Sequence, residues 1–271
     1  MCRSSSISLM RWKSLRSFLG PLPLRTIRVD RVTTSFQLGR CFGIPVRVHF
    51  SWGIIMVVIT WSVATGFLPS FYGGWSQLLY WSIALVATIL LFSSVLVHEM
   101  SHCVVARRGG REVRGITLFL LGGISDLNEE VVSPGREFWV AVAGPAASFG
   151  IAGIALVGFV IVDIPYVNAI LGYLVVMNIV LGVFNLFPAF PMDGGRILRA
   201  IIWRTTGSVS RADNLASRSG NLAGIGLMLI GVYLLVFDSL FVGIWVLGLG
   251  WFIRSAALSF REGQWEGPHL D

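Results

Sequence analysis

Two histidines and a glutamate stand close together in this sequence, in the order His98-Glu99-Met100-Ser101-His102. Residues four apart on a helix project from one face, so both imidazoles can bind a single metal ion. The Glu99 carboxylate lies beside them and can take a proton from an attacking water without being a ligand. The pattern therefore predicts zinc-dependent hydrolysis. The alternative is a helix end at a membrane interface with solvated histidines.

A catalytic zinc site usually has three protein ligands, so two imidazoles leave it one short. Asp193 is the candidate, because it is the only acidic residue between positions 163 and 213 and it ends a long apolar stretch. An aspartate before two glycines is more often a turn residue, but the histidine pair favours the ligand interpretation. Pro188 and Pro191 precede it and are expected to break the helix. Gly194 and Gly195 follow it and are expected to turn the chain sharply.

The composition is that of a membrane protein. Of 271 residues, 55% are hydrophobic and only 13% are charged, whereas soluble domains carry about a quarter charged residues. The net charge of +7 could suggest nucleic-acid binding, but the charges lie at the ends of apolar segments and form no basic stripe. We expect a lipid bilayer and no nucleic acid as partner. Three scattered cysteines without a CxxC pair exclude a cysteine-based zinc site: Cys2, Cys41 and Cys103.

Long charge-free runs predict the spans, since a helix needs about 20 residues to cross the hydrocarbon core. Residues 48–98 contain no Asp, Glu, Lys or Arg and have room for two spans, and four further charge-free runs follow. We predict an all-α polytopic fold with about six transmembrane helices. They lie near residues 48–68, 76–106, 136–161, 166–187, 220–237 and 240–257.

The basic residues give this map an orientation. With six spans, all 21 lysines and arginines fall on one side of the membrane, and the outer loops carry only Asp163 and Asp238. Positive-inside bias then places both termini in the cytoplasm. We expect a multi-pass protein of a bacterial cell (inner) membrane. Because the first thirty residues are rich in Ser and Arg, an organellar membrane with a transit peptide is the alternative.

Both halves of the candidate site approach from the same leaflet. His98 is nine residues before Arg107, so helical rise places it roughly 14 Å inside the interface. Asp193 is three residues from Arg196. One shared ion requires this arrangement, and we expect water to reach it from the cytoplasm.

The two strings together resemble the site-2 protease family of intramembrane zinc metalloproteases (peptidase M50 type). That family pairs HExxH on one core span with an N-x-x-P-x-x-P-x-D-G segment on another. The second string here runs Asn185-Leu186-Phe187-Pro188-Ala189-Phe190-Pro191-Met192-Asp193-Gly194. Residues 119–125 and 143–148 look like two weaker family segments, and the resemblance covers roughly residues 37–258.

The resemblance implies the roles of single residues and a substrate class. His98, His102 and Asp193 would hold one Zn²⁺ per chain, with Glu99 as the catalytic base and Asn185 as a hydrogen-bond donor to the substrate carbonyl or oxyanion. The substrate would be a transmembrane protein already cleaved by another protease, hydrolysed within or near its membrane helix in regulated intramembrane proteolysis. Residues 118–126 would form a membrane-associated β segment that pairs with the unwound substrate.

The resemblance also divides the chain. We expect a basic cytoplasmic leader over 1–45, the intramembrane metalloprotease domain over 46–258 with a three-helix core (76–106, 136–161, 166–187), and a short cytoplasmic tail over 259–271. A metal-ion transporter using the same ligands is the alternative function, although transporters usually distribute polar ligands through both leaflets. A catalytically dead adaptor is a third. The sequence leaves the substrate's identity and the oligomeric state open.

Overall fold

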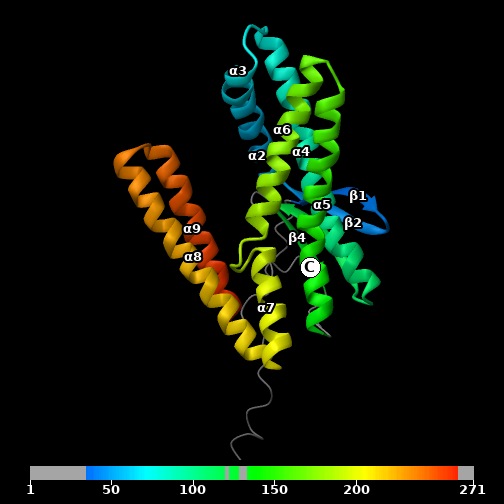
Figure 1. Ribbon diagram of the computed structural model, residues 1–271, viewed down its shortest axis with the longest axis vertical. Helices are drawn as coiled ribbons and strands as arrows, with labels where there is room; N and C mark the ends of the chain where they lie inside the picture. The colour runs from blue at the N-terminus through cyan, green and yellow to red at the C-terminus, as the bar shows by residue number, and fades with distance from the viewer. Residues whose placement is uncertain (1–34, 120–121, 128–132, 262–271) are drawn as a thin grey trace, which may run out of the picture. The chain divides into compact units, whose positions relative to one another are not determined.

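The computed structural model describes residues 35–119, 122–127 and 133–261, which lie within one compact unit over residues 34–269. Six helical segments are long and apolar enough to cross a membrane, as predicted. The all-α polytopic fold is therefore confirmed (Figure 1). The first segment is made of α2 (Ser51–Ser62), a π-helical stretch η1 (Val63–Phe67) and α3 (Leu68–Phe71). The others are α4 (Gln77–Arg108), α5 (Pro134–Ile161), α6 (Pro165–Asn185), α8 (Val209–Phe237) and α9 (Leu240–Arg261).

Local signals set the helix ends. The hydroxyl of Ser76 accepts a hydrogen bond from the Leu79 backbone N–H, and α4 begins there. Ser133 caps α5 in the same way, directly before Pro134, which has no N–H to satisfy. The observed bounds of α4, α5 and α6 lie within two residues of the predicted core spans.

Helices α4, α5 and α6 form the core and pack through small residues. Alanines of α4 and α6 lie in one buried cluster with Tyr80 and Tyr173. A side chain at Gly182 of α6 would lie 2.9 Å from the Phe149 ring of α5, so this ring packs directly on the bare backbone of α6. Close approach through small residues is how membrane helices gain packing energy in an apolar solvent.

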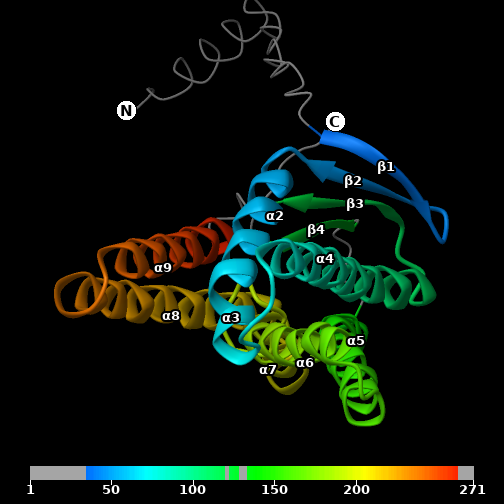
Figure 2. The same ribbon diagram turned by 90° about the horizontal axis from the view of Figure 1, so that it is seen from above.

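A four-stranded sheet covers one flank of α4 (Figure 2). Its strands lie in the order β1 (Ser35–Cys41), β2 (Ile44–His49), β3 (Val113–Phe119) and β4 (Gly122–Leu127). β2 and β3 are parallel, and the outer pairs are antiparallel. The inward side chains of β2 and β3 pack on Met100 and Cys103 of α4.

The sheet changes one expected boundary. β1 and the start of β2 lie inside the leader predicted over 1–45, so residues 35–45 belong to the sheet. The reason is non-local, because β2 pairs with β3 across about seventy residues of chain. Residues 1–34 of the leader and 262–271 of the tail lie outside the described residues.

One helix was not predicted. α7 (Asp193–Thr206) is amphipathic and short, and it begins directly at the candidate ligand Asp193. α8 and α9 follow as a hairpin, in which a side chain at Gly231 would lie 2.6 Å from the Leu247 backbone nitrogen. The hydroxyl of Ser217 donates to the Ala257 carbonyl at the base of this hairpin.

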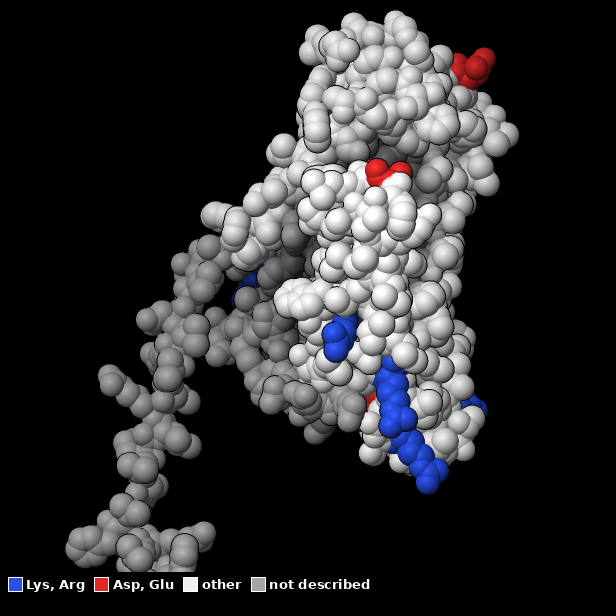
Figure 3. Space-filling view, turned by 90° about the vertical axis from the view of Figure 1, so that its left-hand side faces the viewer, with Lys and Arg blue, Asp and Glu red and all other residues white. Residues whose placement is uncertain are grey.

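Charge is distributed unevenly over the molecule. On the face in Figure 3, lysine and arginine gather in the lower half. Acidic residues lie both beside them and towards the opposite end. The loops between α5 and α6 and between α8 and α9 contain Asp163 and Asp238 and no basic residue. The absence of basic residues from these two loops agrees with the six-span map.

Candidate metal centre

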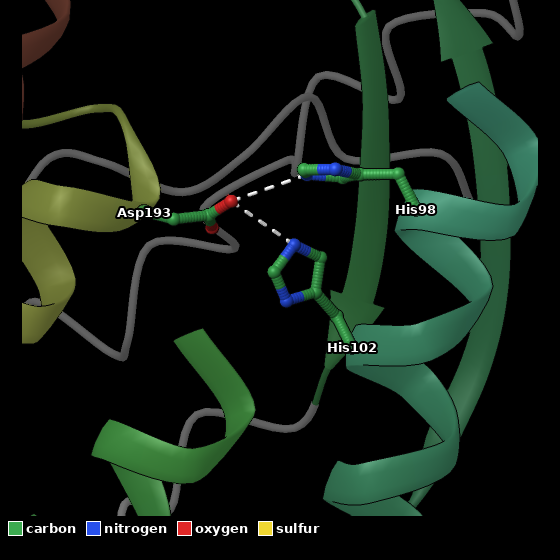
Figure 4. Close-up of side chains that lie close together, drawn as sticks. All are labelled: His98, His102 and Asp193. Carbon is green, nitrogen blue, oxygen red and sulfur yellow. Dashed lines mark hydrogen bonds and ion pairs between the residues drawn. The ribbon is translucent and has the colours of Figure 1, made fainter. Parts of the chain in front are cut away.

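The structure brings the three predicted ligands together. His98 and His102 project from one face of α4 towards Asp193, which opens α7 (Figure 4). Asp193 Oδ2 lies 3.2 Å from Nε2 of each histidine. All three side chains are buried, with 2%, 3% and 7% of their residue surface exposed. Side chains separated by more than ninety positions therefore converge on one point inside the protein.

The far nitrogens of both imidazoles are fixed by α5. His102 Nδ1 lies 2.7 Å from the Val140 carbonyl, which can only accept, so Nδ1 carries the proton. The neutral ring then has a lone pair on Nε2, facing Asp193. His98 Nδ1 lies 2.8 Å from the Ser148 hydroxyl. Such partners set the tautomer and orientation of metal-binding histidines.

The arrangement of Nε2 and carboxylate fits a metal ion. A lone pair facing a carboxylate oxygen at 3.2 Å is repulsive unless the ring takes a second proton or a cation binds both atoms. In tetrahedral zinc sites with bonds of about 2.0–2.1 Å, adjacent ligand atoms lie about 3.3 Å apart. The two nitrogens and the oxygen all lie within 4.8 Å of one another. The donor set and its spacing therefore suit zinc.

Gly144 leaves the space that this group needs. A Cβ atom built there would lie 2.2 Å from His102 Nε2 and 2.5 Å from His98 Nε2. α5 thus passes its bare backbone beside the ligand atoms. Any side chain at this position would enter the space into which both imidazoles point.

Asp193 is held as a carboxylate at the start of α7. Burial alone would raise the pKa of its carboxyl, but the charge and hydrogen bond of a protonated His102, the hydrogen bond of His98 and the nearby Arg196 outweigh burial and hold the pKa below its ordinary value. The ionised form is the one that binds metal. The helix N-terminus adds a favourable field for this negative charge.

The two glycines after Asp193 were expected to turn the chain sharply, and this prediction is wrong. Both lie inside the first turn of α7. A Cβ at Gly194 would lie 2.2 Å from the Leu186 carbonyl oxygen, and one at Gly195 would lie 2.4 Å from the Phe190 backbone nitrogen. The glycines are needed because the 186–192 loop folds back over the helix start.

The two remaining predicted residues are Glu99 and Asn185. Glu99 follows His98 on α4 and is half-buried. Asn185 is the last residue of α6, and its Nδ2 donates to the Leu181 carbonyl of the same helix at 2.9 Å. The predicted roles of Glu99 and Asn185 towards a substrate stay predictions.

Sequence reasoning missed the residues of α5 that orient the histidines, Val140 and Ser148, and the one that leaves room for their ligand atoms, Gly144. The sequence signal nearest to them was the string Ala143-Gly144-Pro145-Ala146-Ala147-Ser148, which resembles a family segment but was assigned no role. The predicted extended segment over 118–126 is present as β3 and β4. In the described sheet, β4 is an edge strand.

Comparison with known proteins agrees with this geometry. The sequence profile of peptidase family M50 matches residues 86–167 and 161–230. Two curated relatives are both named "Putative zinc metalloprotease": Rip3 of Mycobacterium tuberculosis is 40% identical over 82% of this chain, and sll0528 of Synechocystis is 37% identical over 86%. These alignments cover 58% and 62% of the relatives, so this chain spans about three fifths of their length.

A solved structure is similar as well. The site-2 protease from Methanocaldococcus jannaschii superposes with a TM-score of 0.57 at 29% identity, over 84% of this chain and 95% of that one. Almost the whole of that structure therefore has a counterpart here. The names of the relatives agree with the zinc prediction.

Proposed function

Because this chain belongs to peptidase family M50, we propose that it is an intramembrane zinc metalloprotease that hydrolyses peptide bonds within or near the transmembrane helices of other membrane proteins. The observation that carries the proposal is the convergence of His98, His102 and Asp193, buried among membrane-spanning helices, with Glu99 next in sequence to the first. Buried ionisable groups at membrane depth are costly and mark function.

The chain's own side chains account for the chemistry. His98, His102 and Asp193 would hold the zinc ion, which when bound polarises the scissile carbonyl and acidifies water. Glu99 takes the proton of the attacking water and returns it to the departing amine nitrogen. Asn185 donates a hydrogen bond to the carbonyl oxygen as it becomes negative. The buried position of the centre keeps bulk water away from these charges.

A helical substrate must unwind before its peptide bonds can be attacked, because helical carbonyls are hydrogen-bonded. The β4 strand supports a way to hold it, since an edge strand offers free backbone donors and acceptors. We therefore assign the β3–β4 hairpin to substrate binding by strand addition. A substrate that another protease has already shortened has less protein mass to hinder its access to this edge strand.

The basic residues support a cytoplasmic position for the site and for both termini. All 21 lie on one side of a six-span map, and the His-Asp centre lies on the half of α4 that ends in Arg107 and Arg108. The proposed location is a bacterial cell membrane.

Transport of a metal ion is the competing function. A transport path needs further ligands along its length. Over residues 35–119, 122–127 and 133–261, the one group of three or more metal-binding side chains that share a possible ion is His98, His102 and Asp193. This favours an ion that stays bound as a cofactor over an ion that the protein transports.

The test reconstitutes the full chain in liposomes with a model transmembrane peptide and measures both peptide fragments and zinc flux. We expect mass spectrometry to find fragments whose new ends lie within or beside the apolar segment. A zinc chelator should stop their formation. Zinc flux without fragments, persisting in the Glu99→Gln variant, would establish transport and refute the protease.

A further inference from the structure

A cluster of charged side chains outside the metal centre spans three helices. Arg199 of α7 lies between Glu137 in the first turn of α5 and Asp213 near the start of α8. Its Nη1 donates to Glu137 Oε2 and its Nε donates to Asp213 Oδ1, each at 2.5 Å. The guanidinium also lies 5.8 Å from the ring centroids of Trp203 and Phe260.

The two ion pairs of this cluster differ in burial. The side chain of Glu137 is 4% exposed and that of Arg199 is 12% exposed, whereas the side chain of Asp213 is 33% exposed. Exposed pairs are screened and contribute little, but removing one partner of a buried pair leaves a charge without compensation. Although burial alone would lower the pKa of Arg199, the bonds and charges of Glu137 and Asp213 raise it. Because Glu137 is far more buried than Asp213, the Glu137–Arg199 ion pair is the stronger of the two links between helices.

This link joins the two helices that complete the metal centre. One turn after Glu137, α5 presents the Val140 carbonyl to His102, and further along it presents Ser148 to His98. α7 carries Asp193 in its first turn and Arg199 within two turns of it. The helix that orients the imidazoles is thus tied to the helix that carries the carboxylate.

We propose that Arg199 is a positioning residue for the metal centre: its pairing with Glu137 fixes α7 against α5 and so holds Asp193 in reach of both histidines. The proposal rests on the metal site of the proposed function and on no particular substrate. Arginine suits the role because its planar fork reaches two carboxylates at once while its face packs on aromatic rings. A lysine ammonium has the charge without the fork.

The test measures zinc affinity by chelator competition on the full chain in detergent, together with the absorption spectrum of the Co²⁺-loaded protein, which reports the ligand geometry. We expect Arg199→Gln and Glu137→Gln each to weaken zinc binding by roughly 10- to 100-fold and to alter the Co²⁺ bands. The double variant should lose little more than either single one, because both break the same pair. Arg204→Gln is the matched control: this exposed residue of α7 has no ion pair among the described residues, and zinc affinity should stay within about twofold.

A purely structural role predicts a different outcome. If Arg199→Lys and Glu137→Gln bind zinc as the wild type does while the melting temperature of the metal-free protein falls, the cluster only stabilises the fold and the proposal is wrong. If Arg199→Gln fails to fold, the zinc affinity of Arg199→Lys, which keeps the charge, takes its place in the test. Wild-type protein that binds zinc but cleaves no peptide would refute the proposed function and leave the positioning role standing.

Discussion

His98 and His102 each use one ring nitrogen for α5 and the other for the metal centre. The Val140 carbonyl fixes His102, and the Ser148 hydroxyl fixes His98. Because a backbone carbonyl cannot be removed by substitution, Ser148 is the partner that can be tested. It is fully buried, so its hydroxyl has been withdrawn from water to face that imidazole.

Replacing Ser148 with Ala removes the partner of His98 Nδ1 at little change in volume. We expect zinc affinity to fall by roughly 10- to 100-fold, as for other partners of metal-binding histidines. Chelator competition measures it. The control is Ser82→Ala, whose exposed hydroxyl bonds only to the Leu78 carbonyl of its own helix. Equal affinities in both variants would show that Ser148 does not orient the ring.

Gly144→Ala adds one methyl group where the ligand atoms lie. Since that carbon would fall 2.2 Å from His102 Nε2, we expect the purified variant to keep its helical content and lose most of its zinc. Metal analysis after gel filtration measures the stoichiometry. Gly153→Ala, on the same helix with nothing within 4 Å, should bind zinc normally. A fully loaded Gly144→Ala protein would contradict the geometry described above.

At this scale the sequence predicted what depends on local spacing. His98 and His102 share a face because they are four apart on one helix, whatever the rest of the chain does. Asp193 was chosen because the histidine pair lacks a third ligand and no other acidic residue lies between positions 163 and 213. Gly144 and Ser148 could not be assigned, because their roles follow from how α5 packs on α4, and that packing is invisible in a single sequence.

Among the elements, the α8–α9 hairpin is held by close backbone contact. We expect Gly231→Ala to destabilise the protein by about 1–3 kcal/mol, because its methyl group would lie 2.6 Å from the Leu247 backbone. Thermal unfolding in detergent measures the change. Gly226→Ala on the same helix meets nothing within 4 Å and serves as control. A Gly231→Ala protein that melts with the wild type would mean that the hairpin packs differently.

The long helices were predictable because each contains a long charge-free run. The sheet was not, since β1 and β2 are short, and β2 pairs with a strand beyond the first two membrane segments. α7 was not predicted because it is short and contains arginines, whereas the prediction rested on long charge-free runs. The structure shows that the inner face of this helix includes Gly194, Gly195 and Ala200.

In the six-span map of the sequence, all 21 lysines and arginines fall on one side of the membrane, which predicts the orientation of the chain. In a chain with Cys2, Cys41 and Cys103 replaced by Ser, we expect Gly73→Cys to react with an impermeant maleimide from outside intact cells. Thr206→Cys should react only after the cells are opened. Both positions are exposed. The reverse pattern would overturn the proposed topology and with it the cytoplasmic position of the site.

We propose that His98, His102 and Asp193 hold zinc while Glu99 moves the proton. The most direct measurement compares the wild type with Glu99→Gln, recording bound zinc and cleavage of a model transmembrane peptide on the same preparation. Since Glu99 is proposed to act as a base and not as a ligand, the variant should keep one zinc per chain and lose cleavage by about a hundredfold or more. A variant that keeps its zinc and cleaves at the wild-type rate would contradict the account.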